Sequence, residues 1–169
     1  MNTLLRIPVA SDYDTIASWI PDSISCARWA GPHFRFPFVS QELPELLAVP
    51  NSCSFSMAQG NGVLLGFGQF WRRDERSVHL GRIIVSPHER GRGYGKTLCN
   101  LLIAEALNAT NAGTITLRVY RDNAPAFSIY SNLGFLIVES ESNEEVFAME
   151  ARANPALQRT LRNNAALRP

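Results

Sequence analysis

The spacing of apolar and polar residues in the first half of the chain predicts two helices and several antiparallel strands. Ser11 and Asp12 can cap a helix that Pro21 stops. Asn61 and Gly62 form a strong hairpin signal between two of the strands. We expect the second helix at residues 40–47 and strands at residues 4–9, 52–59, 63–72 and 77–86.

Residues 22–39 separate the two expected helices and follow neither a helical nor a strand period. This segment is aromatic and rich in glycine and proline. We therefore expect an irregular loop there.

The second half of the chain predicts a long helix, a strand, a short helix and a closing hairpin. Apolar residues recur at helical spacing within residues 94–109, and residues 114–119 have the composition of a strand. Asn123 caps the short helix, with Pro125 in its first turn and Gly134 at its end. The closing strands are expected at residues 135–140 and 146–150. The order β-α-α-β-β-β-α-β-α-β-β indicates an α/β (α+β) mixed sheet with helices on its faces.

The composition is that of an ordinary soluble globular domain. The chain has 169 residues, of which 46% are hydrophobic and 18% charged. This length fits one domain, expected at residues 1–150. Residues 151–169 change character, with four arginines and no acidic residue. We expect a loose helix or disorder in this basic tail.

Charge and cysteine content narrow the classes of partner. The formal net charge of +1 gives no electrostatic case for nucleic acid or an anionic membrane as partner. We find no apolar run long enough to span a bilayer and no signal-peptide pattern at the start. Cys26, Cys53 and Cys99 form neither a disulfide set nor a metal-ligand pair. We therefore expect a cytoplasmic protein without a metal, and a homodimer is left open.

The segment "HERGRGYGKT", residues 88–97, carries the clearest chemical signal. A Walker A loop would need glycine where Arg90 stands, and a dinucleotide fingerprint would need glycine where Lys96 stands. Glycines between a strand and a helix let backbone N–H groups turn toward an anion, at the positive end of the helix dipole. The loop therefore predicts a phosphate or pyrophosphate site, and a merely tight strand-to-helix turn is the alternative.

A third pattern, [R/Q]-x-x-G-x-[G/A], is complete at Arg90, Gly93 and Gly95. A second motif follows about thirty residues later, N-x-x-A-x-x-x-Y-x-x-x-G-F, at Asn123, Ala126, Tyr130, Gly134 and Phe135. With these two motifs the chain resembles the GCN5-related N-acetyltransferase (GNAT) superfamily. The resemblance covers roughly residues 3–150 and is specific over residues 79–135. It implies the GNAT fold, with a mixed central sheet of about seven strands.

The resemblance also implies acetyl-coenzyme A as co-substrate and no metal. In the family the glycine loop binds the pyrophosphate, and the pantetheine arm runs along the preceding strand. Residues implied as coenzyme contacts are Ile84, Val85, Arg90, Gly91, Arg92, Gly93, Gly95, Lys96, Thr97 and Asn123.

Two residues are candidates for proton transfer. Tyr130 matches the family's general acid, whose hydroxyl faces the sulfur, although its helical spacing also suits a core residue. His79 stands eleven residues before Arg90, where several family members place a glutamate. It is the candidate general base, and a packed strand histidine or deprotonation through water alone are the alternatives.

The acceptor side is expected to be aromatic. Residues 26–38 resemble the family's variable substrate-covering loop, and the wall of an apolar acceptor pocket is expected from Trp29, His33, Phe34, Phe36, Phe38 and Trp71. A simple covering for the sheet is the alternative. The resemblance implies acetyl transfer to a primary amine of a small molecule or peptide. The rival functions are a coenzyme-A-binding sensor without turnover and a nucleotide-binding P-loop protein.

Overall fold

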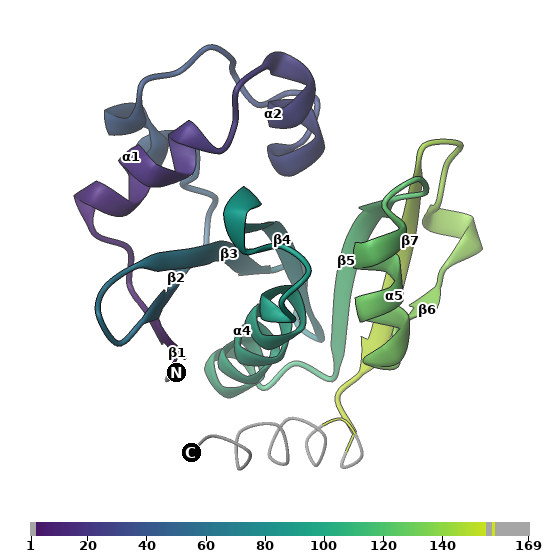
Figure 1. Cartoon of the computed structure of the whole chain (residues 1–169). Helices are drawn as coiled ribbons and strands as arrows, with labels where there is room; N and C mark the ends of the chain where they lie inside the picture. Colours follow the sequence, from purple (N-terminus) through teal and green to yellow (C-terminus); the bar gives the residue numbers. More distant parts are fainter. Residues whose placement is uncertain (1–2, 155–156, 158–169) are drawn as a thin grey trace.

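A computed structural model describes residues 3–154 and 157 of the chain, and these form one mixed sheet with helices around it (Figure 1). The strands are β1 (Thr3–Arg6), β2 (Ser52–Gln59), β3 (Leu64–Arg72), β4 (Ser77–Val85), β5 (Thr114–Tyr120), β6 (Leu136–Ile137) and β7 (Val146–Arg152). The helices are α1 (Ala10–Ser18), α2 (Ser23–Ala30), α3 (Leu43–Leu46), α4 (Tyr94–Thr110) and α5 (Ala124–Asn132).

The sheet has seven strands in the order β1-β2-β3-β4-β5-β7-β6. All neighbouring pairs are antiparallel except β4 and β5, which run parallel. The parallel pairing covers only three residue pairs, from Ser77 with Thr114 to His79 with Thr116. Beyond His79 the two strands separate, and the expected mixed sheet is confirmed with an opening at its centre.

Helices cover both faces of the first half of the sheet. A side chain at Gly66 or Gly68 of β3 would collide with Leu98 or Leu102 of α4, so that face of β3 lies directly on α4. Phe67 lies between these two glycines and therefore points to the other face, because successive side chains of a strand alternate. There it joins the core cluster that α1, α2 and α3 supply.

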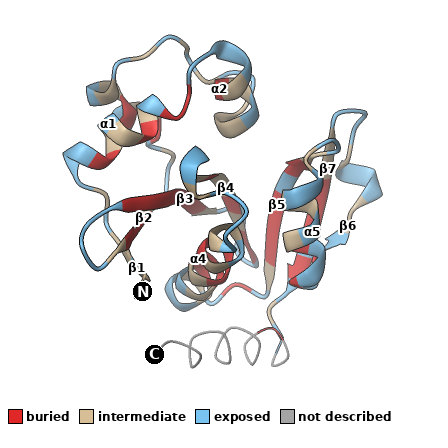
Figure 2. Cartoon of the chain, in the orientation of Figure 1, coloured by how far each residue is buried: buried red, intermediate tan, exposed pale blue. Residues whose placement is uncertain are grey.

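Burial follows these two layers (Figure 2). Buried residues lie on the strands and on the sheet-facing sides of α1 and α4, while the outer helix faces are exposed. The largest buried cluster lies between α4, α5 and the strands β4, β5 and β7. The helices on both faces of the sheet are therefore held mainly by apolar packing, and the loops at the strand ends remain accessible.

Helix α2 is the main departure from the sequence-based expectation of a loop over residues 22–39. Asp22 accepts a hydrogen bond from the amide of Ser25 at 2.7 Å, which caps the first turn. Gly31 ends the helix with a positive φ of 98°. The aspartate and glycine are ordinary start and stop signals, but the short helix of eight residues gives too little periodicity to reveal it.

The expected cap of α1 is confirmed only in part, because Asp12 closes a capping box at the helix start and Ser11 is not the N-cap. Val9 is the N-cap, and Asp12 is the third helical residue, where its carboxylate accepts the amide of Val9 at 2.9 Å. The same carboxylate accepts hydrogen bonds from Arg6 at 2.5 Å and from the Ser56 hydroxyl at 2.8 Å. Asp12 thus joins α1 to β1 and β2. Burial alone would raise its pKa, but these hydrogen bonds outweigh burial and lower it.

Three further element boundaries differ from expectation. The second helix begins as a 3-10 turn at Ser40–Glu42 and continues as the single turn of α3. The sixth strand is only two residues long and is followed by a 3-10 turn at Glu139–Glu141. Strand β7 continues to Arg152, two residues past the expected domain boundary. The rest of the expected basic tail lies outside the described residues, apart from residues 153, 154 and 157.

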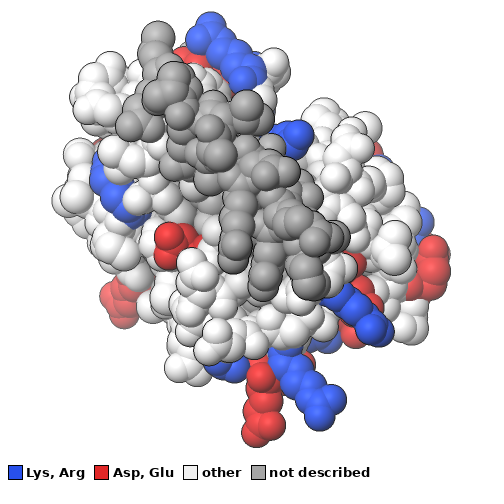
Figure 3. Space-filling view, turned by 90° about the horizontal axis from the view of Figure 1, so that it is seen from below, with Lys and Arg blue, Asp and Glu red and all other residues white. Residues whose placement is uncertain are grey.

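Charged side chains of both signs alternate on the surface seen from below in Figure 3, without a large field of one sign. Among the described residues, no helix has the length and apolar character needed to cross a membrane.

We predict that Asp12→Ala lowers the free energy of unfolding by about 2–3 kcal/mol, because it leaves the Arg6 guanidinium and the Val9 amide without their partner. The folded pKa of Asp12 lies below its unfolded value. The contribution of Asp12 to the free energy of unfolding is therefore complete above the unfolded pKa, and it is lost as pH falls through the folded pKa. Urea unfolding at pH 7 and pH 3 measures this, with the exposed Glu144→Gln as control. An equal loss for Asp12→Ala at both pH values would contradict the prediction.

Candidate active site

The glycine loop before α4 has the backbone shape of an anion cradle. Gly91 and Gly93 have positive φ angles of 77° and 83°. A Cβ added at either residue would meet no atom within 4 Å, so both positions face open space. Gly95 differs, since a Cβ there would lie 3.0 Å from Ile129 of α5. Gly91 and Gly93 therefore leave open space beside the loop, and Gly95 lets α4 and α5 pack closely.

The first turn of α4 presents free backbone donors to this space. The N–H groups that open a helix have no intrahelical acceptor. Here the amide of Thr97 already donates to the Gly93 carbonyl at 3.2 Å, and its hydroxyl donates to the same oxygen at 3.3 Å. The amides of Tyr94, Gly95 and Lys96 are the ones that remain for a ligand.

Basic side chains surround the loop. Arg90 and Lys96 are exposed, and Arg92 donates to Glu89 at 3.0 Å. An exposed ion pair of this kind is weak, so Arg92 can exchange Glu89 for a phosphate at little cost. The loop thus combines main-chain donors with mobile cationic side chains.

Beyond His79, the edge of β4 that faces β5 has no strand partner among the described residues. The amide of Ser86 donates across the sheet to the Leu65 carbonyl at 2.9 Å. Because backbone groups of a strand alternate in direction, Ile84 also faces β3, whereas Ile83 and Val85 face the open edge. Of the two strand residues expected to contact the coenzyme, Val85 has the required direction and Ile84 does not. Ile83 has the same direction as Val85.

Tyr130 lies on α5 and is 8% exposed. It lies with Cys99 of α4 in the buried cluster that joins the two helices. Burial, together with Cys99, raises the pKa of Tyr130 well above its usual range. The phenol is therefore protonated at neutral pH and able to donate. At the start of α5, the side-chain oxygen of Asn123 accepts the Ala126 amide at 3.3 Å, as expected for a cap.

His79 is the last residue of β4 that pairs with β5, so it stands where the opening begins. Its Nδ1 lies 2.8 Å from the hydroxyl of Thr116 on β5, and its ring centroid lies 5.0 Å from that of Trp71. Burial, with smaller effects of Arg73 and Arg118, lowers its pKa to about 4. The imidazole is therefore neutral at physiological pH, with Nε2 free of the contact to Thr116.

The aromatic residues expected on the acceptor side form a connected, half-buried cluster. Trp29 of α2 packs edge-to-face on Phe34, at a centroid distance of 5.8 Å, and Phe38 joins Phe34 to Phe36 at 6.0 and 5.9 Å. The cluster lies against the core on the α1 and α2 face, so these rings do cover the sheet. His33 lies on the same segment but is exposed. The ring of its sequence neighbour Phe34 joins the cluster, whereas its own imidazole does not.

Sequence analysis did not identify Arg82, which the structure puts at the centre of this region. Arg82 has a positive φ of 53° and lies at a register shift between β3 and β4, as expected for a bulge. Its carbonyl accepts the indole N–H of Trp29 at 2.8 Å. Gly81, just before it, lies under the ring of Trp71, because a Cβ there would be 2.4 Å from that ring. An arginine directly before the apolar run "IIV", in the middle of a strand, was the available signal.

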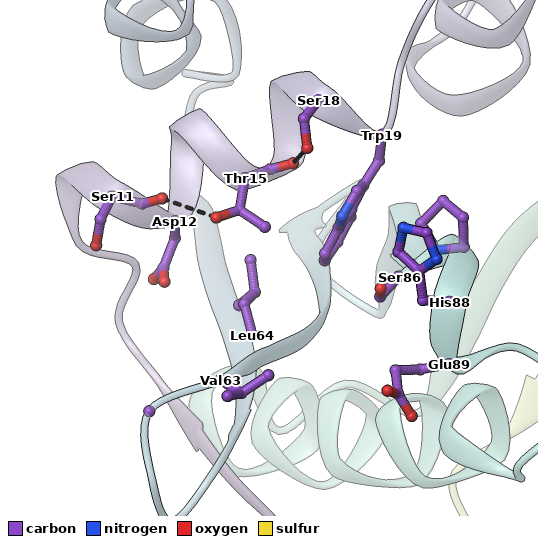
Figure 4. A pocket seen from close by; sticks show the side chains of 12 residues that line it. Ser11, Asp12, Thr15, Ser18, Trp19, Val63, Leu64, Ser86, His88 and Glu89 are labelled. Atoms are coloured by element: carbon purple, nitrogen blue, oxygen red, sulfur yellow. Dashed lines mark hydrogen bonds between the residues drawn. The ribbon is translucent and has the colours of Figure 1, made fainter.

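Two pockets flank these residues. One, of about 600 Å³, lies between α1, the β2–β3 turn and residues 86–89 (Figure 4). Thr15, Ser18, Trp19, Ser86 and His88 are among its lining side chains, and none of the expected catalytic or binding residues is. We therefore assign it no role in the chemistry.

The other pocket, of about 520 Å³, lies between α2 and the loops that follow β5 and precede β7. Arg28 of α2 and Asp122 of the β5–α5 loop line it and form an ion pair at 2.6 Å. The Arg28 guanidinium also lies 4.4 Å from the ring centroid of Tyr120. This ion pair joins the two halves of the sheet above the opening.

Comparison with solved structures supports the fold. The spermidine N-acetyltransferase from Vibrio cholerae, solved with CoA and spermine, matches 89% of this chain and 95% of its own, at a TM-score of 0.71 and 22% identity. The PaiA N-acetyltransferase from Thermoplasma acidophilum, solved with coenzyme A, matches at a TM-score of 0.65 and 19% identity over 90% of this chain and 99% of its own.

Comparison with curated sequences points the same way. An N-acetyltransferase 9-like protein of Nematostella vectensis is 26% identical over 145 residues, 83% of this chain and 65% of the relative. A mycothiol acetyltransferase of Streptomyces avermitilis is 28% identical over 130 residues, 74% of this chain but only 41% of the relative. The model of the acetyltransferase (GNAT) family matches residues 23–135, which include both motifs and the opening between β4 and β5. The chain therefore belongs to the GNAT acetyltransferase family.

Proposed function

We propose that this chain transfers the acetyl group of acetyl-coenzyme A directly to a primary amine of a small molecule or peptide. One observation carries the proposal: the open glycine loop and the free amides of α4 stand beside the unpaired edge of β4. A diphosphate and an extended arm, joined as in coenzyme A, need these two features side by side.

The residues present fit the coenzyme. Any side chain at Gly91 or Gly93 would extend into the open space where the diphosphate belongs. The amides of Tyr94, Gly95 and Lys96 would donate to its oxygens, with Arg90 and Arg92 adding charge-assisted contacts. Ile83 and Val85 would hold the pantetheine arm as an added strand, and acetyl-coenzyme A supplies the thioester.

The remaining residues can carry out the proton transfers. A free alkyl amine has a pKa of about 10.4 on the lysine scale and must lose a proton before it attacks. His79, which is neutral and has Nε2 available, would relay this proton through water to solvent, because a ring with a pKa of about 4 is too weak a base to hold it. The amine nitrogen then bonds to the acetyl carbon, and the carbon–sulfur bond breaks. Tyr130 would donate its phenolic proton toward the departing thiolate.

The similar proteins support an amine as acceptor. The Vibrio cholerae neighbour is named as a spermidine N-acetyltransferase, and its structure contains spermine. The chain spans 65% and 41% of the lengths of the two curated relatives described above, so their own activities are not carried over. The acceptor proposed here is accordingly the class of primary amines.

The rival within the same fold is a module that binds coenzyme A without turnover. Incubation with acetyl-coenzyme A and a panel of primary amines, with release of free thiol as the readout, separates the two functions. Thiol release that depends on the amine supports the transferase. Saturable coenzyme binding without release would support the rival, and stabilisation by ATP with magnesium but not by coenzyme A would support a P-loop protein.

We predict that Gly93→Val abolishes measurable coenzyme A binding in calorimetry, because the residue needs a positive φ and its Cβ would enter the diphosphate space. The matched control is Gly62→Val, a glycine with a φ of 89° that also faces open space but lies in the β2–β3 turn. It should keep full affinity. Unchanged affinity in the Gly93 variant would refute the loop assignment.

We predict that Tyr130→Phe lowers kcat by about tenfold to a hundredfold and leaves the affinity for coenzyme A nearly unchanged, because the ring is kept and only the proton donor is lost. Steady-state kinetics and calorimetry measure the two quantities. A parallel fall in affinity and melting temperature would indicate that the hydroxyl only supports packing against Cys99.

We predict that the His79 ring titrates near pH 4 in the folded protein, which two-dimensional NMR can follow. The folded pKa lies below the unfolded value of about 6.5. His79 therefore costs stability as pH falls from about 6.5 toward 4, since the unfolded chain takes up the proton first. A midpoint at or above 6.5 would contradict the burial argument.

His79→Ala tests the role of His79 in proton transfer. If this variant keeps the wild-type pH–rate profile, His79 is not the base.

A further inference from the structure

Arg82 is a partly buried cation on the proposed acceptor face, and none of the described residues gives it a carboxylate partner. The ion pairs formed among the described residues do not include it. Its guanidinium carbon lies 5.3 Å from the ring centroid of Phe34 and 5.8 Å from that of Trp71. Burial lowers its pKa, in keeping with a cation that lacks a compensating anion. Such a group has an unmet requirement for a negative partner.

The orientation of the guanidinium is fixed by a buried network. Nη1 donates to the Leu47 carbonyl at 2.9 Å and to Gln69 Oε1 at 2.8 Å. Gln69 is fully buried, and its own Nε2 donates to Leu47 and to the Ser54 hydroxyl. These bonds fix which end of the Gln69 amide faces Arg82. The guanidinium is therefore held in place before any ligand arrives.

The donors left over match a carboxylate. Every hydrogen bond found between this guanidinium and the described residues uses Nη1. Nε and Nη2 remain, and they project side by side in the plane of the guanidinium. Two parallel N–H donors of arginine bind the two oxygens of a carboxylate in a bidentate pair.

The position of Arg82 relative to His79 connects this donor pair to the chemistry. Both groups flank Trp71, with the His79 ring centroid 5.0 Å and the Arg82 guanidinium carbon 5.8 Å from its rings. An acceptor that packs against Trp71 would therefore meet both groups. The Trp71 ring also lies against Gly81, where a Cβ would be 2.4 Å from it.

We propose that the acceptor amine also carries a carboxylate, as an amino acid does, and that Arg82 binds this carboxylate through Nε and Nη2. This proposal rests on the proposed acetyl transfer and narrows its substrate class. Arg73, whose cation lies near His79, is paired with Glu141 at 3.0 Å, so the attraction for a carboxylate comes from Arg82 itself. An acceptor with a carboxylate can pair with this cation, and a polycationic acceptor cannot.

The experiment compares matched acceptors. The kcat/KM for thiol release is measured with several L-amino acids, with their amides, with spermidine and with O-phosphoethanolamine. The acids should exceed their own amides by tenfold or more, since the amides keep the amine and lose only the charge. A preference for the amides or for spermidine would overturn the proposal while leaving acetyl transfer in place. A preference for O-phosphoethanolamine would overturn the choice of carboxylate.

Variants assign the preference to Arg82. Arg82→Met should reduce the acid-to-amide ratio to about one, and Arg82→Lys should give an intermediate ratio because it keeps the charge without the fork. The control is Arg35→Met, an arginine of the 31–39 segment that already pairs with Glu42 and should leave the ratio unchanged. An unchanged ratio in Arg82→Met would overturn the proposal. A ratio within one protein does not depend on how much of it is folded.

Two further measurements cover the remaining outcomes. If Arg82→Met fails to fold, Gln69→Glu tests the same point, because a carboxylate beside Arg82 should neutralise it and abolish the preference. If no amine releases thiol, the proposed transfer fails, and calorimetry with N-acetylated amino acids in the presence of coenzyme A still tests Arg82. Binding that is lost in Arg82→Met would support the carboxylate site, and absence of binding would overturn it.

Discussion

Backbone polar groups of a strand need hydrogen-bond partners, and in this protein β4 loses one of its two neighbours halfway along its length. The pairing with β5 ends at His79 and Thr116, while the pairing with β3 continues to Val85. The unpaired edge lies between two helical layers, where a ligand with an extended polar backbone can complete the ladder. The glycine loop follows the free end of β4, and His79 marks the point where the opening begins. The proposed binding of an extended coenzyme depends on this opening.

The two faces of β4 differ in burial. On the side of α4 and α5, Val78 and Leu80 are tightly buried in the largest core cluster, with Cys99 of α4 and Tyr130 of α5. On the side of α2, His79 and Arg82 are half-buried, next to Trp71 of β3. The bulge at Arg82 changes the register of β4 and turns its side chain toward this second face. A charged residue in a largely apolar strand thus lies where we propose that the acceptor binds.

Much of the architecture was predictable because the strands β2, β3 and β4 and the helix α4 have strong periodicity and clear turn residues. The glycine loop was predictable because its spacing has a direct physical meaning at a helix start. Helix α2 was not, since eight residues between Asp22 and Gly31 are too few for a periodic signal. The role of Asp12, on helix α1, was missed because its partners Arg6 and Ser56 lie on the strands β1 and β2. Arg82 was missed for a similar reason. The direction of its side chain depends on a bulge and on a hydrogen bond to the Leu47 carbonyl, and neither can be read from the local sequence.

The ion pair between Arg28 and Asp122 has a mechanical consequence. The β5–β7 half of the sheet is joined to the β1–β4 half by a ladder of three residue pairs, by the shared core under α4 and α5, and by two exposed ion pairs, Arg73 with Glu141 and Arg28 with Asp122. Because both of its side chains are exposed, the ion pair between Arg28 and Asp122 is weakened by salt, whereas the apolar core shared by the two halves is not. High ionic strength therefore loosens the outer contact across the opening and leaves the underlying sheet intact.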